Sequence, residues 1–442
     1  MKWLAPLAFC ALMALAAPQR RIFPYSWEQH DLSNGLRLII IPTDYPNVVA
    51  LYIVVHAGSR NEVEPGKSGF AHLFEHMMFR GTRNFPPEKY EAVLKSAGAS
   101  SNAYTTDDYT AYHTTFSKED LETILALEAD RFQNLEYSPD VFRTEALAVL
   151  GEYNKNSSDP ANKLEEVLRD TAFDRHTYKH TTMGFLKDIL DMPNQFDYSR
   201  LFFERYYRPE FTTMILAGDV DPAHARSLVE KHWGNWKRGS FRPEIPSEPP
   251  ANGPRSNRIN WSSPTLPWIV VSFRGPAYSD EEPDHAALDL IAYLGFSESS
   301  ELYRKLVIRE QRVDILEAEN LRRVDPYLFN VWARVKKEAD VAAVQKEILA
   351  TLEAFREKPV DEQRLERVKR HLRYRFALSL EDSEAVAATV ARFVALRRTP
   401  ETINRLFELY EKITPATIQA VARKYFTEQG RTIVTLTGGR SQ

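Results

Sequence analysis

Short runs of aliphatic and β-branched residues recur along the first half of the chain and predict strands. The clearest are residues 36–42 (LRLIIIP) and 48–58 (VVALYIVVHAG). Residues 109–116 and 211–218 (FTTMILAG) have the same character. Branched side chains at this density favour extended backbone. We therefore expect a sheet in this half of the chain.

Helical patterns lie between these strands. Residues 68–79 predict a helix that Gly81 closes. The segment from Ser117 to Asp120 has the pattern of a capping box, and the helix DLETILALEADRFQNL (120–135) follows it. A third helix is expected from Ser138 to about Asn156, because serine can cap it and Pro139 suits its first turn. The first half therefore mixes strands and helices.

The second half repeats this order after a proline-rich break at residues 241–254, which holds five prolines. A strand is expected over 266–273 and a helix over 285–294. Residues 422–439 parallel residues 203–218, since in both an aromatic pair closes a helix and a branched strand runs to glycine. These parallels indicate two copies of one α+β unit.

We therefore expect an α+β fold of two homologous halves, each a mainly antiparallel sheet packed with helices. The expected domains are residues 22–240 and 258–442, joined by a proline-rich linker over 241–257. Aligned on their strands, the second half places Asp289, Ala292 and Tyr293 where the first has His72, Glu75 and His76. The second domain is therefore expected to bind no metal.

Composition places the chain among ordinary globular proteins. Of its 442 residues, 43% are hydrophobic and 27% are charged, which excludes disordered and collagen-like chains. Lysine and arginine number 57 against 61 aspartate and glutamate, a formal charge of −4. A chain with so small a net charge lacks the excess of basic residues that is typical of nucleic-acid-binding proteins.

The first residues have the pattern of an export signal. Lys2 precedes an apolar run over 3–17 that is shorter than the about 20 residues a membrane span needs. The small residues Ala14 and Ala16 suit cleavage after Ala16, so residues 1–16 are expected to be a signal peptide, with an uncleaved anchor as the alternative. The mature chain would lack a transmembrane segment and the single cysteine, Cys10, which excludes disulfides and thiol catalysis.

The chemistry of the chain centres on residues 69–79 (GFAHLFEHMMF). His72 and His76 are four apart, so a helix places them on one face, where both can bind one metal ion. Glu75 projects beside them, in the inverse order of the His-Glu-x-x-His helix. His176 and His180 are also four apart, but no carboxylate is spaced as in the first motif, and we interpret them as structural.

A catalytic zinc site usually takes three protein ligands, so a third must come from elsewhere. The helix after Pro139 offers Glu145 and Glu152, which are seven apart and share a face. The alternative is that His72 and His76 are core residues. Their apolar neighbours favour a buried helix, in which unpaired histidine and glutamate would be costly and a metal would remove that cost.

Over residues 25–439 the sequence resembles the inverzincin metallopeptidases of the pitrilysin and mitochondrial processing peptidase family. Residues 69–82 resemble its zinc helix, 99–105 (ASSNAYT) its substrate-edge strand, and 145–152 (EALAVLGE) the segment of the third ligand. The resemblance implies the following roles: one zinc ion bound by His72, His76 and Glu152, Glu75 as general base, Glu145 orienting a ligand, and Asn102 and Ala103 holding substrate.

By this resemblance the chain is a zinc-dependent endopeptidase that hydrolyses peptides or unfolded segments and forms half of a peptidase clamp. Substrate would join the sheet as an added strand. The chain would act after export, in the periplasm if the organism is Gram-negative. Active relatives also carry an arginine and a tyrosine, seven apart, that hold the substrate carbonyl.

Val307 and Asp314 stand at the positions of this pair, and neither can donate to a developing oxyanion. Arg309 and Arg312, on a continuing helix, would point to other faces. The chain therefore resembles the zinc-bearing subunit of bacterial heterodimers in which a homologous partner supplies the pair. A self-sufficient peptidase, alone or as a homodimer, and a non-catalytic assembly or scaffold subunit of the family are the alternatives.

Overall fold

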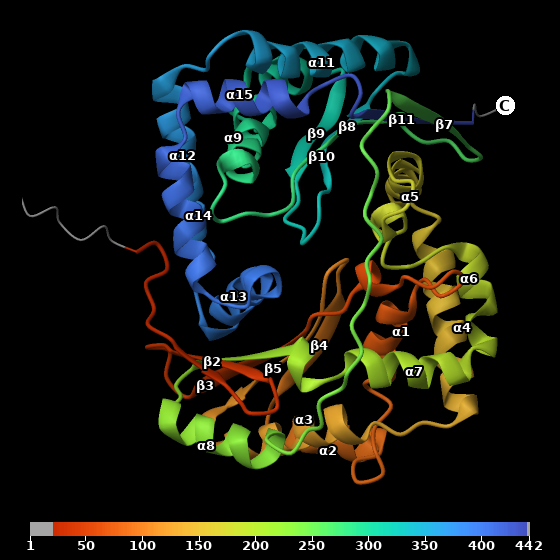
Figure 1. Cartoon of the computed structure of the whole chain (residues 1–442). Helices are drawn as coiled ribbons and strands as arrows, with labels where there is room; N and C mark the ends of the chain where they lie inside the picture. Colours follow the sequence, from red (N-terminus) through yellow and green to blue (C-terminus); the bar gives the residue numbers. More distant parts are fainter. Residues whose placement is uncertain (1–20, 440–442) are drawn as a thin grey trace, which may run out of the picture.

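The computed structural model describes residues 21–439 and shows two halves, one above the other in Figure 1. The expected signal peptide, residues 1–16, and Cys10 lie outside the described residues. Within residues 21–439, no helix has the length and apolar character needed to cross a membrane.

The first half forms a six-stranded sheet with helices. Its strands are β1 (Glu28–Asp31), β2 (Arg37–Pro42), β3 (Val48–Val55), β4 (Ser100–Thr105), β5 (Thr110–Ser117) and β6 (Thr212–Gly218). Its helices are α1 (Phe70–Met77), α2 (Pro87–Ser96), α3 (Leu121–Asn134), α4 (Pro139–Asn156), α5 (Pro160–Ala172), α6 (Leu186–Asp191), α7 (Phe196–Tyr206) and α8 (Pro222–Trp233).

The second half forms a five-stranded sheet with helices. Its strands are β7 (Arg255–Trp261), β8 (Trp268–Arg274), β9 (Val313–Asn320), β10 (Leu328–Val335) and β11 (Arg431–Gly438). Its helices are α9 (Pro283–Phe296), α10 (Glu301–Tyr303), α11 (Val341–Glu357), α12 (Glu362–Leu378), α13 (Ser383–Arg397), α14 (Glu401–Lys412) and α15 (Pro415–Tyr425). A π-helical turn, Arg304–Arg309, follows α10.

Apart from the edge strand β1, which has no counterpart among the described strands of the second sheet, the two sheets have the same strand order, which confirms the expected repeat. The first sheet runs β1-β2-β6-β3-β5-β4 and the second β7-β11-β8-β10-β9. Each has one parallel pair, β2 with β6 and β7 with β11, and its other pairs are antiparallel. The edge strands β4 and β9 are therefore counterparts. By order along the chain, so are α1 and α9, α4 and α12, and α5 and α13.

Each sheet is covered on one face by helices of its own half and on the other by a helix of the opposite half. In the first sheet, Leu38 and Ile53 face α1, α3 and α8, whereas Ile39 and Tyr52 share a core with α13. In Figure 1, α13 lies above the first sheet, and it packs against β3 and β6. Burial on both faces explains the nearly continuous apolar runs of these strands.

The second sheet shows the reciprocal arrangement. Val271 and Phe329 pack toward α9, α11 and α15, while Val270 and Leu436 pack against Leu164 of α5, which belongs to the first half. The stretch between α8 and β7, which includes the proline-rich residues, has no regular secondary structure. Whether residues 22–240 and 258–442 are separate domains on either side of a 241–257 linker stays a prediction.

Two local expectations are wrong. Ser117 does not cap α3, because β5 ends there and a 3₁₀ turn over Lys118–Asp120 follows. The Ser117 hydroxyl donates to Glu119 and accepts no hydrogen bond from a backbone amide of the described residues. The segment that holds Val307 and Asp314 is not one helix. It turns as a π-helix and then enters β9, so Asp314 lies on an edge strand.

Candidate metal and active site

Helix α1 begins at a buried turn that demands glycine. Gly69 has φ of +92°, and a Cβ there would approach Ile189 Cδ1 to 2.4 Å. The buried Glu62 carboxylate accepts hydrogen bonds from the backbone amides of Gly69 and Ala71, both at 2.7 Å. This contact satisfies amides that have no partner within the helix and fixes the start of α1.

Three potential ligands converge between α1 and α4. Nε2 of His72 and Nε2 of His76 each lie 3.5 Å from Oε2 of Glu152. One ligand atom from each residue can be chosen so that all lie within 4.8 Å of one another. The 3.5 Å separations exceed the about 2.7–3.2 Å of ordinary hydrogen bonds. The groups therefore surround a shared point without bonding to one another.

The environment of His72 suits a metal ligand. Its side chain is buried, and its Nε2 faces Oε2 of Glu152 at 3.5 Å. Burial lowers the pKa of His72, which favours the neutral imidazole that metals bind. Two imidazole nitrogens and one carboxylate form a ligand set that zinc accepts. The residues present therefore fit a zinc ion.

Glu145 supports this cluster from behind His76. Its Oε2 lies 3.7 Å from His76 Nδ1, and its Oε1 accepts from Arg80 Nε at 2.9 Å. Contact with Glu145 raises the pKa of His76. Burial alone would raise the pKa of Glu145, but His76 and Arg80 bring it below its ordinary value. A carboxylate on the far ring nitrogen orients a metal-binding histidine.

Glu75 lies on the open side of the cluster. Its Oε2 accepts a hydrogen bond of 2.7 Å from the Thr105 hydroxyl at the end of β4. A cavity of about 470 Å³ opens here, and its lining includes His72, Glu75, Thr105 and Glu152. A water or peptide in this cavity would contact Glu75 and the three converging groups together. The contacts of Thr105 with Glu75 and of Arg80 with Glu145 were not expected from the sequence, because neither residue has a spacing that signals its contact.

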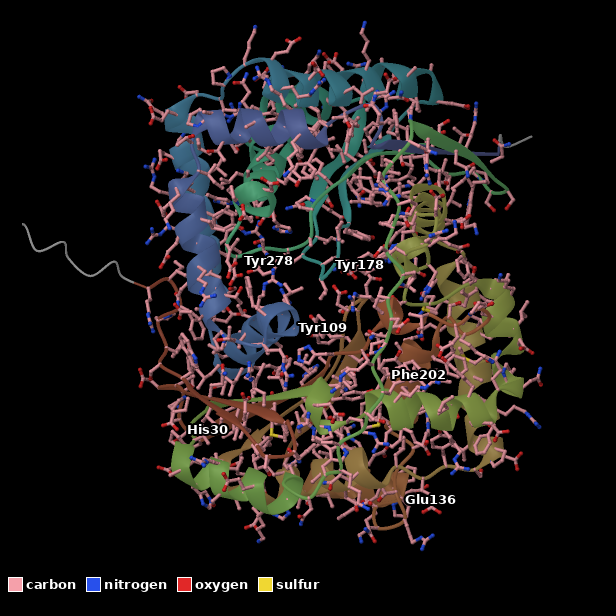
Figure 2. The ribbon with its side chains drawn as sticks, in the orientation of Figure 1. His30, Tyr109, Glu136, Tyr178, Phe202 and Tyr278 are labelled. Carbon is pink, nitrogen blue, oxygen red and sulfur yellow. The ribbon has the colours of Figure 1, made fainter. Side chains whose placement is uncertain are left out.

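The chain beyond β4 is held by buried ion pairs. Asp107 contacts Arg169 of α5 at 2.7 Å and Arg323 of the second half at 2.6 Å. The Tyr178 hydroxyl donates to Asp108 at 2.6 Å, and Figure 2 shows Tyr178 at the junction of the two halves. The strand end that carries Thr105 is thus fixed from both halves.

Asn102 and Ala103 lie on β4, the last strand of its sheet. Asn102 pairs with His113 and Ala103 with Tyr112, both on β5, so the other edge of β4 has no strand partner among the described residues. Asn102 is exposed and Ala103 is buried. An extended peptide can add to such an edge through main-chain hydrogen bonds.

In the second half, the position of His72 is taken by a satisfied buried cluster. Asp289 accepts from Asn320 Nδ2 at 2.8 Å, from Arg322 Nη2 at 3.3 Å and from the Tyr410 hydroxyl. Asp314, at the expected tyrosine position, makes an ion pair of 2.9 Å with Arg334.

Two family models match consecutive parts of the chain. Residues 38–185 match the insulinase model of peptidase family M16, and residues 196–372 match the peptidase M16 inactive domain. The chain belongs to the M16 peptidase family. The expected family and fold are therefore confirmed, and membership supports a peptidase-like function in general terms.

Named relatives span most of the chain. The zinc protease PqqE of Helicobacter pylori is 28% identical over 416 residues and is matched over 92% of both chains. An Arabidopsis thaliana protein named "Probable mitochondrial-processing peptidase subunit beta" is 24% identical, with 94% of this chain and 78% of that protein covered.

Solved structures show the same fold. A protease from Helicobacter pylori superposes with a TM-score of 0.87 at 27% identity, covering 93% of this chain and 99% of that one. The first half of the periplasmic protease PqqL from Escherichia coli gives 0.74 at 20% identity, with 93% and 92% covered. The latter likeness concerns the fold alone.

Proposed function

We propose that the protein is a zinc-dependent endopeptidase that hydrolyses peptides or unfolded segments. His72, His76 and Glu152 bind one zinc ion, and Glu75 is the general base. The observation that carries the proposal is the convergence of these three groups within 4.8 Å, with Glu75 lining the same cavity. The names of PqqE and of the other zinc proteases in the family support it.

A bound zinc ion lowers the pKa of a coordinated water toward 7 and polarises the substrate carbonyl. Glu75 removes a proton from the attacking water at its carboxylate and returns it to the leaving amine. Thr105 donates to Oε2 of Glu75 and so holds the carboxylate in one orientation. Glu145 holds His76 through Nδ1, which directs Nε2 toward the shared point.

Substrate is proposed to lie along β4 as an added strand, with Asn102 and Ala103 in contact with it. Main-chain hydrogen bonds would provide affinity without strict sequence preference. The exposed Asn102 adds a side-chain amide at the same edge.

A homologous partner subunit is proposed to complete the site as a heterodimer. Val307 has no polar group, and Asp314 is occupied by Arg334, so neither stabilises an oxyanion. The relative named as a peptidase subunit supports a two-chain arrangement. Export to the periplasm rests on the signal-like residues 1–16 and on the PqqL structure's description as periplasmic.

Cleavage of an unstructured peptide by the zinc-loaded chain from residue 17 onward, measured with the homologous subunit and without it, tests this function, with Glu75→Gln as the control. We expect Glu75→Gln to bind zinc like the wild type and to lose turnover by about 100-fold or more. Cleavage by the chain alone would disprove the need for a partner. Equal function of Glu75→Gln and wild type in the presence of the homologous subunit would overturn the enzyme assignment in favour of a scaffold subunit.

A further inference from the structure

The second half has a large cavity at the place that corresponds to the candidate metal site. The first-half cavity lies among α1, α4 and β4. The second-half cavity, of about 1180 Å³, lies among their counterparts α9, α12 and β9. Ala292 and Tyr293, at the positions of Glu75 and His76, line it. The second half therefore has a cavity at the equivalent place but lacks the candidate metal ligands of the first half.

Four arginines and four carboxylates line this second cavity. Arg304 follows α10, and Arg364, Arg367 and Arg375 project from α12. Within residues 21–439, Arg304 and Arg367 have no ion-pair or hydrogen-bond partner for their side chains, and Arg375 donates only to the Tyr293 hydroxyl at 3.1 Å. By position, α12 is the counterpart of α4, which carries Glu145 and Glu152.

Neighbouring carboxylates do not neutralise these arginines. Of the acidic residues that line the cavity, Glu301 pairs with Arg309, and Asp314 pairs with Arg334, both from outside the lining. Glu298 and Glu317 are the two lining carboxylates without an ion pair to any described residue, and four guanidinium groups line the same cavity. The charged side chains that line the cavity therefore balance in number, but among those without an ion-pair partner within residues 21–439 four arginines exceed two glutamates.

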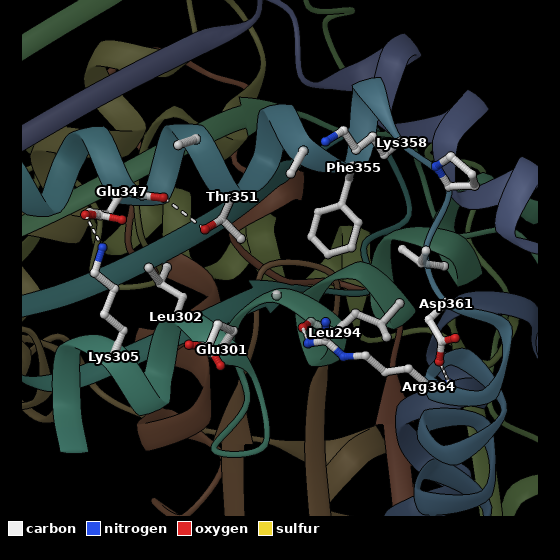
Figure 3. A pocket seen from close by; sticks show the side chains of 15 residues that line it. Leu294, Glu301, Leu302, Lys305, Glu347, Thr351, Phe355, Lys358, Asp361 and Arg364 are labelled. Atoms are coloured by element: carbon white, nitrogen blue, oxygen red, sulfur yellow. Dashed lines mark hydrogen bonds and ion pairs between the residues drawn. The ribbon is translucent and has the colours of Figure 1, made fainter. Parts of the chain in front are cut away.

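The arginines also repel one another. Arg304, Arg364 and Arg367 line the same cavity. Burial lowers the pKa of Arg364 and the charges of Arg367 and Arg304 lower it further, against the opposing charges of Asp361 and Glu301. Figure 3 shows Arg364 extending toward Leu294 in the adjoining pocket, where its guanidinium donates to the Leu294 carbonyl. Arg364 is thus anchored at the boundary of the two pockets. Close like charges cost free energy that a bound anion would recover.

We propose that this cavity binds an acidic segment of the peptide substrate, with the carboxylates at Arg304, Arg364 and Arg367. A peptide is favoured over a small anion because the cavity is large and its arginines come from two separate elements, so one small anion would not contact all of them. The proposal rests on the proposed peptidase function, to which it adds a preference for acidic residues away from the scissile bond.

The test measures binding by fluorescence anisotropy to the full mature chain with Glu75→Gln, so that no peptide is cleaved. The probes are an unstructured peptide with several glutamates near one end and the same peptide with glutamines. At low ionic strength we expect the glutamate peptide to bind about ten-fold more tightly. The double variant Arg304→Gln/Arg367→Gln should remove that difference.

Arg370→Gln is the matched control, because Arg370 is an exposed residue of α12 outside the cavity lining. It should keep the preference, and thermal unfolding should show all variants folded, since the replaced side chains are exposed. Equal binding of both peptides, or equal loss in Arg370→Gln, would overturn the proposal. Full displacement of the glutamate peptide by inorganic phosphate would assign the site to small anions and also overturn it.

Cleavage by the active chain, with its partner if one is needed, separates this inference from the proposed function. We expect the glutamate peptide to have a lower KM at equal kcat. If both peptides bind as expected but neither is cleaved, the peptidase assignment fails while the anion site stands. If both are cleaved and bound equally, the peptidase assignment stands and the acidic preference fails.

Discussion

The cavity beside α1 and the cavity beside α9 occupy equivalent places in two copies of one framework, yet their polar groups behave differently. In the first, His72, His76 and Glu152 approach one another without forming hydrogen bonds. In the second, Asp289 is engaged by Asn320, Arg322 and Tyr410. The polar groups of the first cavity therefore lack hydrogen bonds to one another, whereas the carboxylate of the second has hydrogen-bond partners within the fold.

This difference separates a binding site from a structural cluster. Buried polar groups are costly unless they have partners, so an incomplete set persists where something else supplies the partner. The framework positions the helix pair and the edge strand alike in both halves. We propose that the residues on the helices then decide whether the place binds a metal, holds the fold together or attracts an anion.

Removing one carboxylate from the first cavity should have the largest effect. Glu152→Gln replaces a charged ligand by a neutral amide, and we expect zinc affinity to fall by more than about 100-fold. Competition with a chromophoric chelator measures this affinity. Arg367→Gln on the counterpart helix should leave it within about two-fold. Unchanged zinc affinity in Glu152→Gln would remove the distinction between the two cavities.

The complementary change in the second half should alter stability and leave zinc binding intact. Asp289→Asn weakens three contacts of a buried carboxylate, and we expect the free energy of unfolding to fall by about 2 kcal/mol. Denaturant unfolding of the zinc-free chain measures it. Asp314→Asn, which breaks a more exposed pair with Arg334, should cost less than about 1 kcal/mol. Zinc loss in Asp289→Asn would contradict a purely structural role.

The contact between Thr105 of β4 and Glu75 extends the comparison, because Ala292 at the place equivalent to Glu75 has no carboxylate for β4 to contact. Thr105→Val removes the hydroxyl that donates to Glu75, and we expect kcat to fall about ten-fold with KM little changed. Thr105→Ser should restore kcat. A change in KM alone would show that Thr105 acts on substrate binding instead of on Glu75.

The smallest expected effect is the pH dependence contributed by His285, one turn before Asp289. Burial lowers its pKa below the ordinary 6.5, so the folded chain keeps it neutral while the unfolded chain takes up a proton. Its contribution to stability is therefore complete above about pH 6.5 and is lost as the pH falls, by at most about 1.4 kcal/mol per unit. Relative to wild type, His285→Asn should flatten the stability profile between pH 6.5 and 5. An unchanged slope would contradict this assignment.

Local elements were predictable where local signals suffice. The helix expected from Ser138 to Asn156 is α4, and the Ser138 hydroxyl accepts from the Val141 amide at 3.3 Å. His72 and His76 share a face because any α-helix places residues four apart together. The capping signal at Ser117 failed because a 3₁₀ turn intervenes before α3, which a pattern of four residues does not reveal.

Contacts between distant segments were not predictable from pattern alone. Glu152 reaches the histidines only because α4 packs against α1, and only the family resemblance singled it out over other carboxylates. Nothing in the spacing of Thr105 indicates its bond to Glu75. The pairs of Asp107 with Arg169 and Arg323 join residues from both halves and depend on how the sheets meet.

The exchange of α5 and α13 between the two sheets makes each half depend on the other for a complete core. Without α13, the face of the first sheet that carries Ile39 and Tyr52 would be open to water, and without α5 so would Val270 and Leu436. Unfolding of one half would therefore expose apolar surface in the other. We expect the chain to melt in a single cooperative transition, and either half expressed alone to aggregate.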